Sequence, residues 1–134
     1  MLQVVDFSEQ LEKHIIELET KCEDICIGLQ KRFGQDFEKL GVHFIIDFLR
    51  TKKGKPAKQS NLFEENYESF FDIGIEENEE YFPNAYIPIW KCKKEMFQLV
   101  GYLTKNQPEG IEKKLVKIII EMFQEKMEEQ DKSL

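Results

Sequence analysis

The chain has 134 residues, of which 41% are hydrophobic and 34% are charged, and its formal net charge is −7. The length fits one domain, the apolar content excludes an intrinsically disordered chain, and no apolar stretch approaches the ~20 residues that cross a bilayer. The negative charge disfavours general binding to nucleic acid or to anionic membranes, so we expect one domain over residues 1–134 without a membrane partner.

The first predicted helix covers residues 7–33. Its apolar residues recur at alternating intervals of four and three, which is the heptad spacing of a helix packed on other helices. Asp6 and Glu9 form a capping pattern before it, and Gly34 stands where a C-terminal cap is expected. The apolar seam consists of Leu11, Ile15, Leu18, Cys22, Ile25 and Leu29.

A second helix is predicted over residues 36–50, with phenylalanines on one side and aliphatic residues over much of the rest. A buried strand over 42–49 is the competing interpretation, because a short apolar run fits either structure. Residues 51–60 hold four lysines, a glycine and a proline, so we expect a loop there.

A third helix is expected to begin at residue 61 and a fourth to cover 90–103, since large apolar residues in both segments follow the helical period. Between them, residues 72–90 contain Pro83 and Pro88, which exclude one continuous helix. We expect either an irregular loop or a small hairpin in that segment.

The last helix begins at Asn106, an asparagine cap followed by an early proline, and the polar tail after about residue 127 is expected to fray. Its seam consists of Ile111, Leu115, Ile118 and Met122. The sequence therefore predicts an all-α fold, a compact bundle of about five helices with an irregular or hairpin-containing segment near 72–90. The two heptad seams would also allow a homodimer.

The sequence offers no coherent set of catalytic residues, and we predict no enzyme, no cofactor and no metal site. Glycine-rich phosphate loops and a nucleophile elbow are absent. His43 and Asp47 could pair as an imidazole with an orienting carboxylate, but we favour the interpretation that they mark the exposed side of a helix. Isolated Glu-x-x-Glu pairs leave a metal-dependent hydrolase as the third-ranked hypothesis.

The cysteines Cys22, Cys26 and Cys92 are odd in number and have no disulfide-framework spacing. We expect them to pack as small apolar residues in a reducing compartment, and therefore predict a cytoplasmic location. The first residues hold no basic stretch followed by an apolar run, so no secretory signal is expected.

Charge and aromatic residues concentrate in residues 59–90. This segment has no lysine or arginine, eight acids and eight of the sixteen aromatic residues, and removing its acids leaves the rest of the chain at +1. Aromatic surface surrounded by acids is typical of a site for a basic protein partner. We therefore predict a non-enzymatic protein–protein interaction module, such as an adaptor, a chaperone-like protein or an inhibitor. The predicted partner-binding residues are Glu76, Glu77, Glu79, Glu80, Tyr81, Phe82, Tyr86 and Trp90.

The alternative hypothesis is a small helical regulator that binds nucleic acid. A lysine-rich segment over residues 50–58 could contact phosphates, although charge runs of this length are common. The residues that would make these contacts are Arg50, Lys52, Lys53, Lys55 and Lys58.

Overall fold

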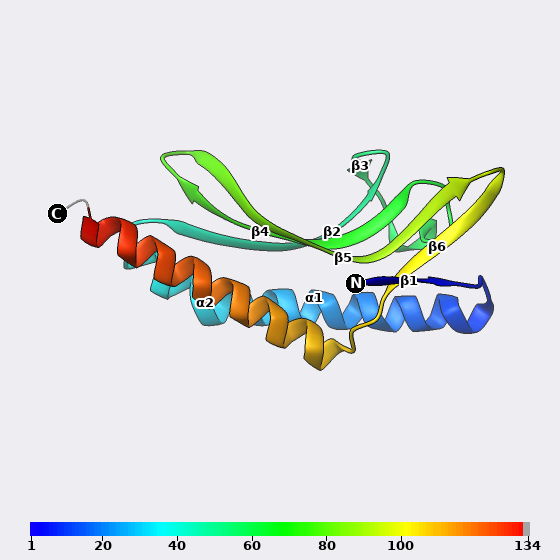
Figure 1. Cartoon of the computed structure of the whole chain (residues 1–134), viewed down its shortest axis with the longest axis horizontal. Coiled ribbons are helices and arrows are strands. Elements are labelled where there is room, and N and C mark those ends of the chain that lie inside the picture. The colour runs from blue at the N-terminus through cyan, green and yellow to red at the C-terminus, as the bar shows by residue number, and fades with distance from the viewer. Residues whose placement is uncertain (133–134) are drawn as a thin grey trace.

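The computed structural model describes residues 1–132 and shows an α+β fold, in which one antiparallel sheet is covered on one face by two long helices (Figure 1). The six strands are β1 (Leu2–Val5), β2 (His43–Lys52), β3 (Lys55–Pro56), β4 (Tyr67–Glu77), β5 (Glu80–Glu95) and β6 (Gln98–Thr104). The helices are α1 (Glu9–Glu38) and α2 (Pro108–Lys132), with a short 3-10 turn, η1 (Gln59–Asn61). The strand order is β1-β6-β5-β4-β2-β3.

The prediction of an all-α bundle of about five helices is wrong, because the middle of the chain forms the sheet. The first and last predicted helices exist as α1 and α2, but strands occupy most of the helices expected over 36–50, from residue 61 and over 90–103. In β4 every second residue is buried, which is the period of a strand with one covered face. These buried residues are Tyr67, Ser69, Phe71 and Ile73.

The segment 72–90 belongs to a long hairpin of β4 and β5, with Asn78 and Glu79 in its turn. Both prolines of β5 precede Trp90, and this part of the strand has only one neighbour because β6 pairs with Trp90–Glu95 alone. Proline lacks the N–H that a second neighbour would need, so it is tolerated along this free edge. Two bulges also interrupt the β4–β5 ladder, and bulges increase the local bend and twist of a sheet.

Both predicted apolar seams lie inside the monomer. They pack between the helices and the covered face of the sheet, where they form one core with the inward side chains of the strands. The buried seam residues are Ile15, Leu18, Cys22 and Leu29 in α1 and Ile111, Leu115 and Met122 in α2. Ile118 of the predicted seam is partly buried, and its neighbour Ile119 is fully buried. The heptad spacing therefore reflects packing on the protein's own sheet.

The ends of α1 differ from the predicted caps. Ser8 rather than Asp6 is the N-cap, and its hydroxyl accepts a hydrogen bond from the backbone N–H of Leu11 at 3.0 Å. The helix continues past Gly34, and the chain turns at Gly41, whose φ of +80° suits a residue without a side chain.

A buried carboxylate fastens α1 to the sheet. Glu19 is fully buried and accepts hydrogen bonds from Arg50 Nε at 2.8 Å, from the Tyr67 hydroxyl at 2.7 Å and from Gln59 Nε2 at 3.2 Å. Arg50 also pairs with Glu23, one helical turn along α1. Each oxygen of the buried carboxylate therefore has a partner, which is the condition under which a charge is tolerated in a core.

The side chain of Gln30 protects the outer edge of β2. Its amide nitrogen donates to the backbone oxygen of Phe44 at 2.7 Å, and its amide oxygen accepts from the backbone N–H of Ile46 at 3.0 Å. The thiol of Cys26 lies 3.1 Å from the Ile46 backbone oxygen and donates to it. Helix α1 thus supplies the partners that a further strand would have given, which leaves this edge closed to other chains.

No helix among residues 1–132 combines the length and the apolar content needed to span a membrane. Helix α2 is described through Lys132, and residues 133–134, the end of the tail expected to fray after about 127, lie outside the described residues.

Candidate functional site

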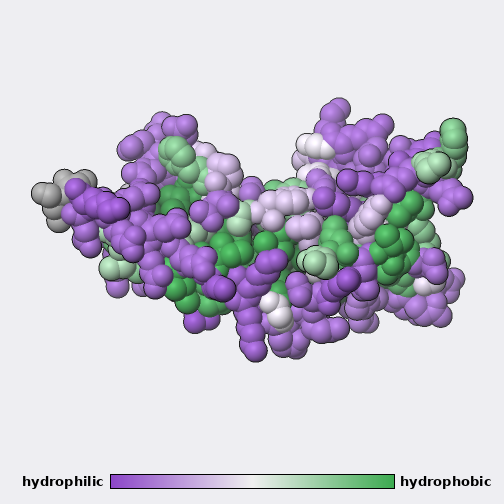
Figure 2. Space-filling model, viewed as in Figure 1, coloured by the Kyte–Doolittle hydropathy of each residue, from purple (hydrophilic) through white to green (hydrophobic). Residues whose placement is uncertain are grey.

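The upper face of the sheet is covered by neither helix. In Figure 1 both helices lie below the sheet and the strands curve upward at both ends, and Figure 2 shows a depression between the two raised ends. We call this surface the open face. Its side chains, assigned from the strand register and the burial pattern, are Ile45, Asp47 and Leu49 of β2, Glu68, Phe70 and Asp72 of β4, and Tyr81, Tyr86 and Lys91 of β5.

Aromatic side chains form one part of the open face. The rings of Phe70 and Tyr86 lie 5.0 Å apart between centroids, and the Tyr86 hydroxyl donates to Glu68 Oε2 at 3.0 Å. Lys91 Nζ lies 5.3 Å from the centroid of the Tyr86 ring. Burial of the hydroxyl and the charge of Glu68 raise the pKa of Tyr86, so it remains a neutral donor. Tyr86 is nevertheless 45% exposed, and its ring offers contact area whose position these neighbours fix.

Two carboxylates face each other a little farther along the sheet. Asp47 and Asp72 are directly opposite in the β2–β4 ladder, where like charges are destabilising. Burial raises the pKa of Asp47, and the charge of Asp72 raises it further. Among residues 1–132, no lysine, arginine or histidine forms an ion pair with either carboxylate. The pair therefore holds negative charge that the described chain does not neutralise.

The hydroxyl of Tyr81 adjoins this pair. Its ring crosses Gly74, where an added Cβ would lie 2.5 Å from Tyr81 Oη, so only glycine leaves room for it. Burial raises the pKa of Tyr81 to about 12, and the charge of Asp72, a hydrogen bond to Asp72 and the charge of Asp47 raise it further, so the hydroxyl is protonated. The oxygen is buried beside Asp72, and its lone pairs accept no hydrogen bond from the described residues. A donor group from outside could therefore supply one.

The four predicted glutamates lie together at the tip of the β4–β5 hairpin. Glu76 and Glu77 end β4, Glu79 is in the turn, and Glu80 begins β5. Glu77 forms an ion pair with Lys126 of α2 at 2.6 Å, and the other three project from one raised end of the open face.

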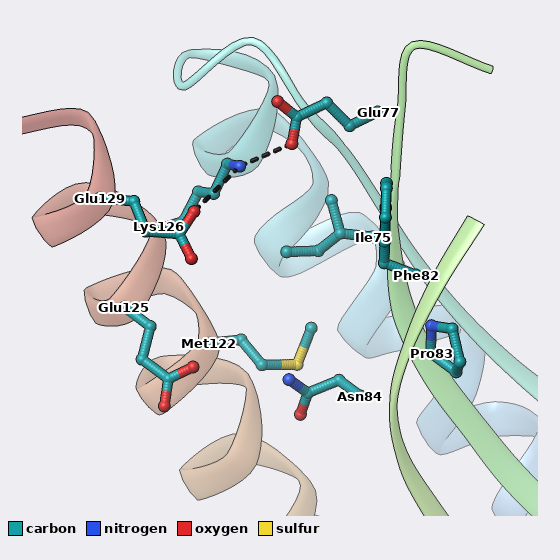
Figure 3. Close-up of a pocket in the computed structure, with 9 residues that line it drawn as sticks. All are labelled: Ile75, Glu77, Phe82, Pro83, Asn84, Met122, Glu125, Lys126 and Glu129. Carbon is teal, nitrogen blue, oxygen red and sulfur yellow. Dashed lines mark hydrogen bonds and ion pairs between the residues drawn. The ribbon is translucent and has the colours of Figure 1, made fainter. Parts of the chain in front are cut away.

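Phe82 is 48% exposed and faces the opposite way, toward α2. It lines a pocket of about 330 Å³ between the β4–β5 hairpin and the C-terminal half of α2 (Figure 3). We call this cavity the end pocket. Its residues are Ile75, Glu77, Phe82, Pro83, Asn84, Met122, Glu125, Lys126 and Glu129.

Trp90 is the predicted contact residue that the structure places away from the surface. It has 0% exposure, and its indole N–H donates to the backbone oxygen of Leu62 at 2.7 Å. The rings of Phe7 and Phe63 pack edge-on against it, at centroid distances of 6.0 and 6.1 Å. Its role in this fold is to fill the core under β5.

The lysine-rich segment 50–58 forms the β2–β3 hairpin, where a loop was expected. Arg50 is held by two carboxylates of α1, and Lys52 Nζ pairs with Glu64 at 2.6 Å, so two of the five predicted phosphate contacts are already neutralised. The lysines that remain exposed are Lys53, Lys55 and Lys58.

Sequence reasoning placed Asp47 beside His43 on a helix, whereas both lie on β2, and it missed Phe70 and the opposition of Asp47 to Asp72. The signal that could have found them is the alternation of β2 and β4, since reading both segments with a period of two places these residues on one face. The sequence of either strand alone does not predict which residue of β2 pairs with which residue of β4.

All three cysteines carry free thiols. Burial raises the pKa of Cys22 to about 12 and those of Cys26 and Cys92 to about 11, so the thiols remain protonated and act as small apolar groups. Within residues 1–132, no three histidine, cysteine, aspartate or glutamate side chains are grouped as a metal site would require.

Comparison of the chain with protein-family models, with curated proteins and with solved structures finds no match.

Proposed function

We propose that this chain is a non-enzymatic protein-interaction module whose open face binds a basic segment of another protein. The observation that carries the proposal is the unneutralised Asp47–Asp72 pair beside the buried Tyr81 hydroxyl, whose oxygen accepts no hydrogen bond from the described residues, on a face that no helix covers. A lysine or arginine side chain would place positive charge between the carboxylates and could donate a hydrogen bond to Tyr81 Oη.

The neighbouring aromatic residues suit the rest of such a segment. Phe70 and Tyr86 offer flat apolar area, on which the methylene stem of a lysine or arginine can pack. The glutamates at the hairpin tip add a negative potential at one end of the face, which would speed the encounter with a basic partner. Tyr86 is therefore expected to contribute to binding strength, and the tip glutamates mainly to the association rate.

The test uses a fluorescein-labelled peptide that alternates arginine with leucine, titrated against the protein by fluorescence anisotropy. The double variant Asp47→Asn/Asp72→Asn should weaken binding about 30-fold, which corresponds to ~2 kcal/mol. The matched control is Glu112→Gln/Glu121→Gln on the exposed side of α2, which makes the same change in net charge.

A specific site predicts little loss with the control variant and NMR shift changes confined to β2, β4 and β5. Equal weakening by both double variants would show that the peptide responds only to net charge, and the proposal would then be abandoned.

A cytoplasmic location is also part of the proposal. It is supported by three free thiols that are kept protonated in the fold, since an oxidising compartment usually uses cysteines in disulfides. Fractionation of cells that express the chain, followed by immunoblotting, tests it. Nucleic-acid binding through the five basic residues of 50–58 stays an alternative, although Arg50 and Lys52 are already paired with carboxylates.

A further inference from the structure

The turn between β5 and β6 presents two large apolar side chains to solvent. Met96 is 92% exposed and Phe97 is 95% exposed, and neither belongs to the core or to the layer packed against it. Both residues have left-handed backbone conformations, with φ values of 46° and 72°. Figure 2 shows apolar atoms at the raised end of the molecule that carries this hairpin.

The two other hairpin turns among residues 1–132 show that this backbone shape does not require apolar residues. Lys53 and Gly54 have φ values of 54° and 77°, and Asn78 and Glu79 have 55° and 64°. Such turns favour glycine, asparagine and aspartate, which tolerate positive φ and face water without cost. In the isolated monomer Met96 and Phe97 are therefore unfavourable both in their backbone conformation and in their exposure to water. This combination indicates that the tip is buried in a complex.

The opposite end of the molecule holds a pocket of suitable chemistry. The wall of the end pocket includes Ile75, Phe82 and Met122, and its volume of about 330 Å³ can admit one or two large side chains (Figure 3). Three glutamates and one lysine stand around it, so its rim is negative overall. These rim residues are Glu77, Glu125, Glu129 and Lys126.

Charge on the two ends is complementary. Lys93 and Lys94 precede the tip and form no ion pair among the described residues, whereas Glu95 is bound by the Tyr102 hydroxyl at 2.6 Å. In Figure 1 the β5–β6 hairpin lies at one end of an elongated molecule, and the end pocket, between the β4–β5 hairpin and the end of α2, lies at the other. A chain therefore cannot insert its tip into its own pocket.

We propose that the Met96–Phe97 tip of one copy inserts into the end pocket of a second copy. The apolar side chains would be buried among Ile75, Phe82 and Met122, and the lysines would approach the acidic rim. Such a contact joins two different surfaces of the protein. An assembly of any length therefore has one free tip at one end and one free pocket at the other. It can grow by adding further copies or close as a ring. This arrangement differs from a homodimer through the heptad seams, which are buried in the monomer.

The test measures the mass of the full chain by size-exclusion chromatography with light scattering over a range of concentrations. The wild-type protein should grow beyond a dimer as concentration rises, and added salt should weaken the assembly because the flanking charges are exposed. Met96→Asn/Phe97→Gly removes the tip and installs favoured turn residues, and Asn84→Trp fills the pocket from an exposed position. Each variant alone should be monomeric.

The decisive sample is an equal mixture of the two variants. One contributes an intact pocket and the other an intact tip, so the mixture should form a dimer with one copy of each and nothing larger. The tip variant should unfold at the same temperature as the wild type or higher, which separates loss of assembly from loss of folding.

A wild-type protein that stays monomeric at all concentrations would overturn the proposal, and so would a mixture that stays monomeric while the wild type assembles. Co-sedimentation of a monomeric wild type with phosphatidylserine–phosphatidylcholine vesicles, lost in the tip variant, would also overturn it and would assign the tip to a lipid surface.

Discussion

Glu19 and Arg50 are the residues whose replacement should affect the fold most. The Glu19 carboxylate has no exposed surface and Arg50 is its main cationic partner, so removing the arginine would leave an unpaired charge in the core. We predict that Arg50→Met lowers the free energy of unfolding by about 3 kcal/mol. Lys52→Met, which breaks the solvent-exposed pair with Glu64, should have a much smaller effect. Urea denaturation of both variants measures the contrast.

The double variant Glu19→Met/Arg50→Met gives the internal check. Since it removes the buried carboxylate together with its partner, it should recover much of the stability lost in Arg50→Met. Equal stability of the single and double variants would mean that Glu19 is not the source of the penalty.

Asp47 should destabilise the free protein at neutral pH. Its folded-state pKa is raised by burial and by Asp72, so the folded protein binds a proton more readily than the unfolded chain does. The free energy of unfolding therefore falls as pH rises from the pKa of Asp47 in the unfolded chain to its higher pKa in the folded protein. Below the unfolded-state pKa, Asp47 is protonated in both states and does not destabilise the fold. Because Asp47 remains exposed, solvent screens the repulsion, and we predict that Asp47→Asn raises the free energy of unfolding by only about 0.5 kcal/mol at neutral pH and has no effect near pH 3.

Chemical denaturation of Asp47→Asn and wild type at both pH values measures that difference. The exposed Glu121→Gln serves as the control and should show no comparable change between the two. A stabilising effect of Asp47→Asn that persists at low pH would contradict a charge-based origin.

At the scale of elements, the close contact between β5 and β6 depends on one glycine. A Cβ at Gly101 would lie 2.3 Å from Trp90 Cη2, so the indole ring occupies the space that any side chain there would need. We predict that Gly101→Ala lowers the free energy of unfolding by about 2 kcal/mol and red-shifts the emission of the single tryptophan. Gly28→Ala is the matched control, because nothing lies within 4 Å of its Cβ and alanine favours the helix by about 1 kcal/mol.

Guanidinium denaturation followed by tryptophan fluorescence measures both effects in one experiment. A Gly101→Ala variant as stable as the wild type would show that the Trp90 ring can move without cost, contrary to the packing described above.

The helices were predictable because their signals are long and repeated. Residues 9–38 and 108–132 carry several turns of apolar periodicity, and each apolar side lies on the same sheet. The strands were misread because short segments with adjacent aromatic residues, such as Phe70 and Phe71, fit a period of 3.6 as well as a period of two. Pro83 and Pro88 also argued against a strand in the sequence. They are tolerated in β5 because β6 pairs only with Trp90–Glu95, which the sequence of β5 does not show.

For the whole molecule, the open face and the two ends should act as separate surfaces. Asp47, Asp72 and Tyr81, with the aromatic pair Phe70 and Tyr86, lie on the open face, and none of these five residues lines the end pocket. We predict that Asp47→Asn/Asp72→Asn leaves the concentration dependence of the molecular mass unchanged. Met96→Asn/Phe97→Gly should leave the peptide affinity unchanged within about twofold. Light scattering and anisotropy on both variants test this, and a variant that impairs both activities would show that the surfaces are coupled.

The sequence by itself determined the two amphipathic helices, the interior position of the cysteines, and the concentration of acids and aromatic residues in 59–90, because these are local properties of spacing and composition. Only the tertiary structure decided that the middle of the chain is a sheet, that Trp90 is buried, and that Asp47 opposes Asp72. Strand pairing joins residues far apart in the chain, so which side chains meet on the open face depends on register and curvature, and neither is encoded in any single segment.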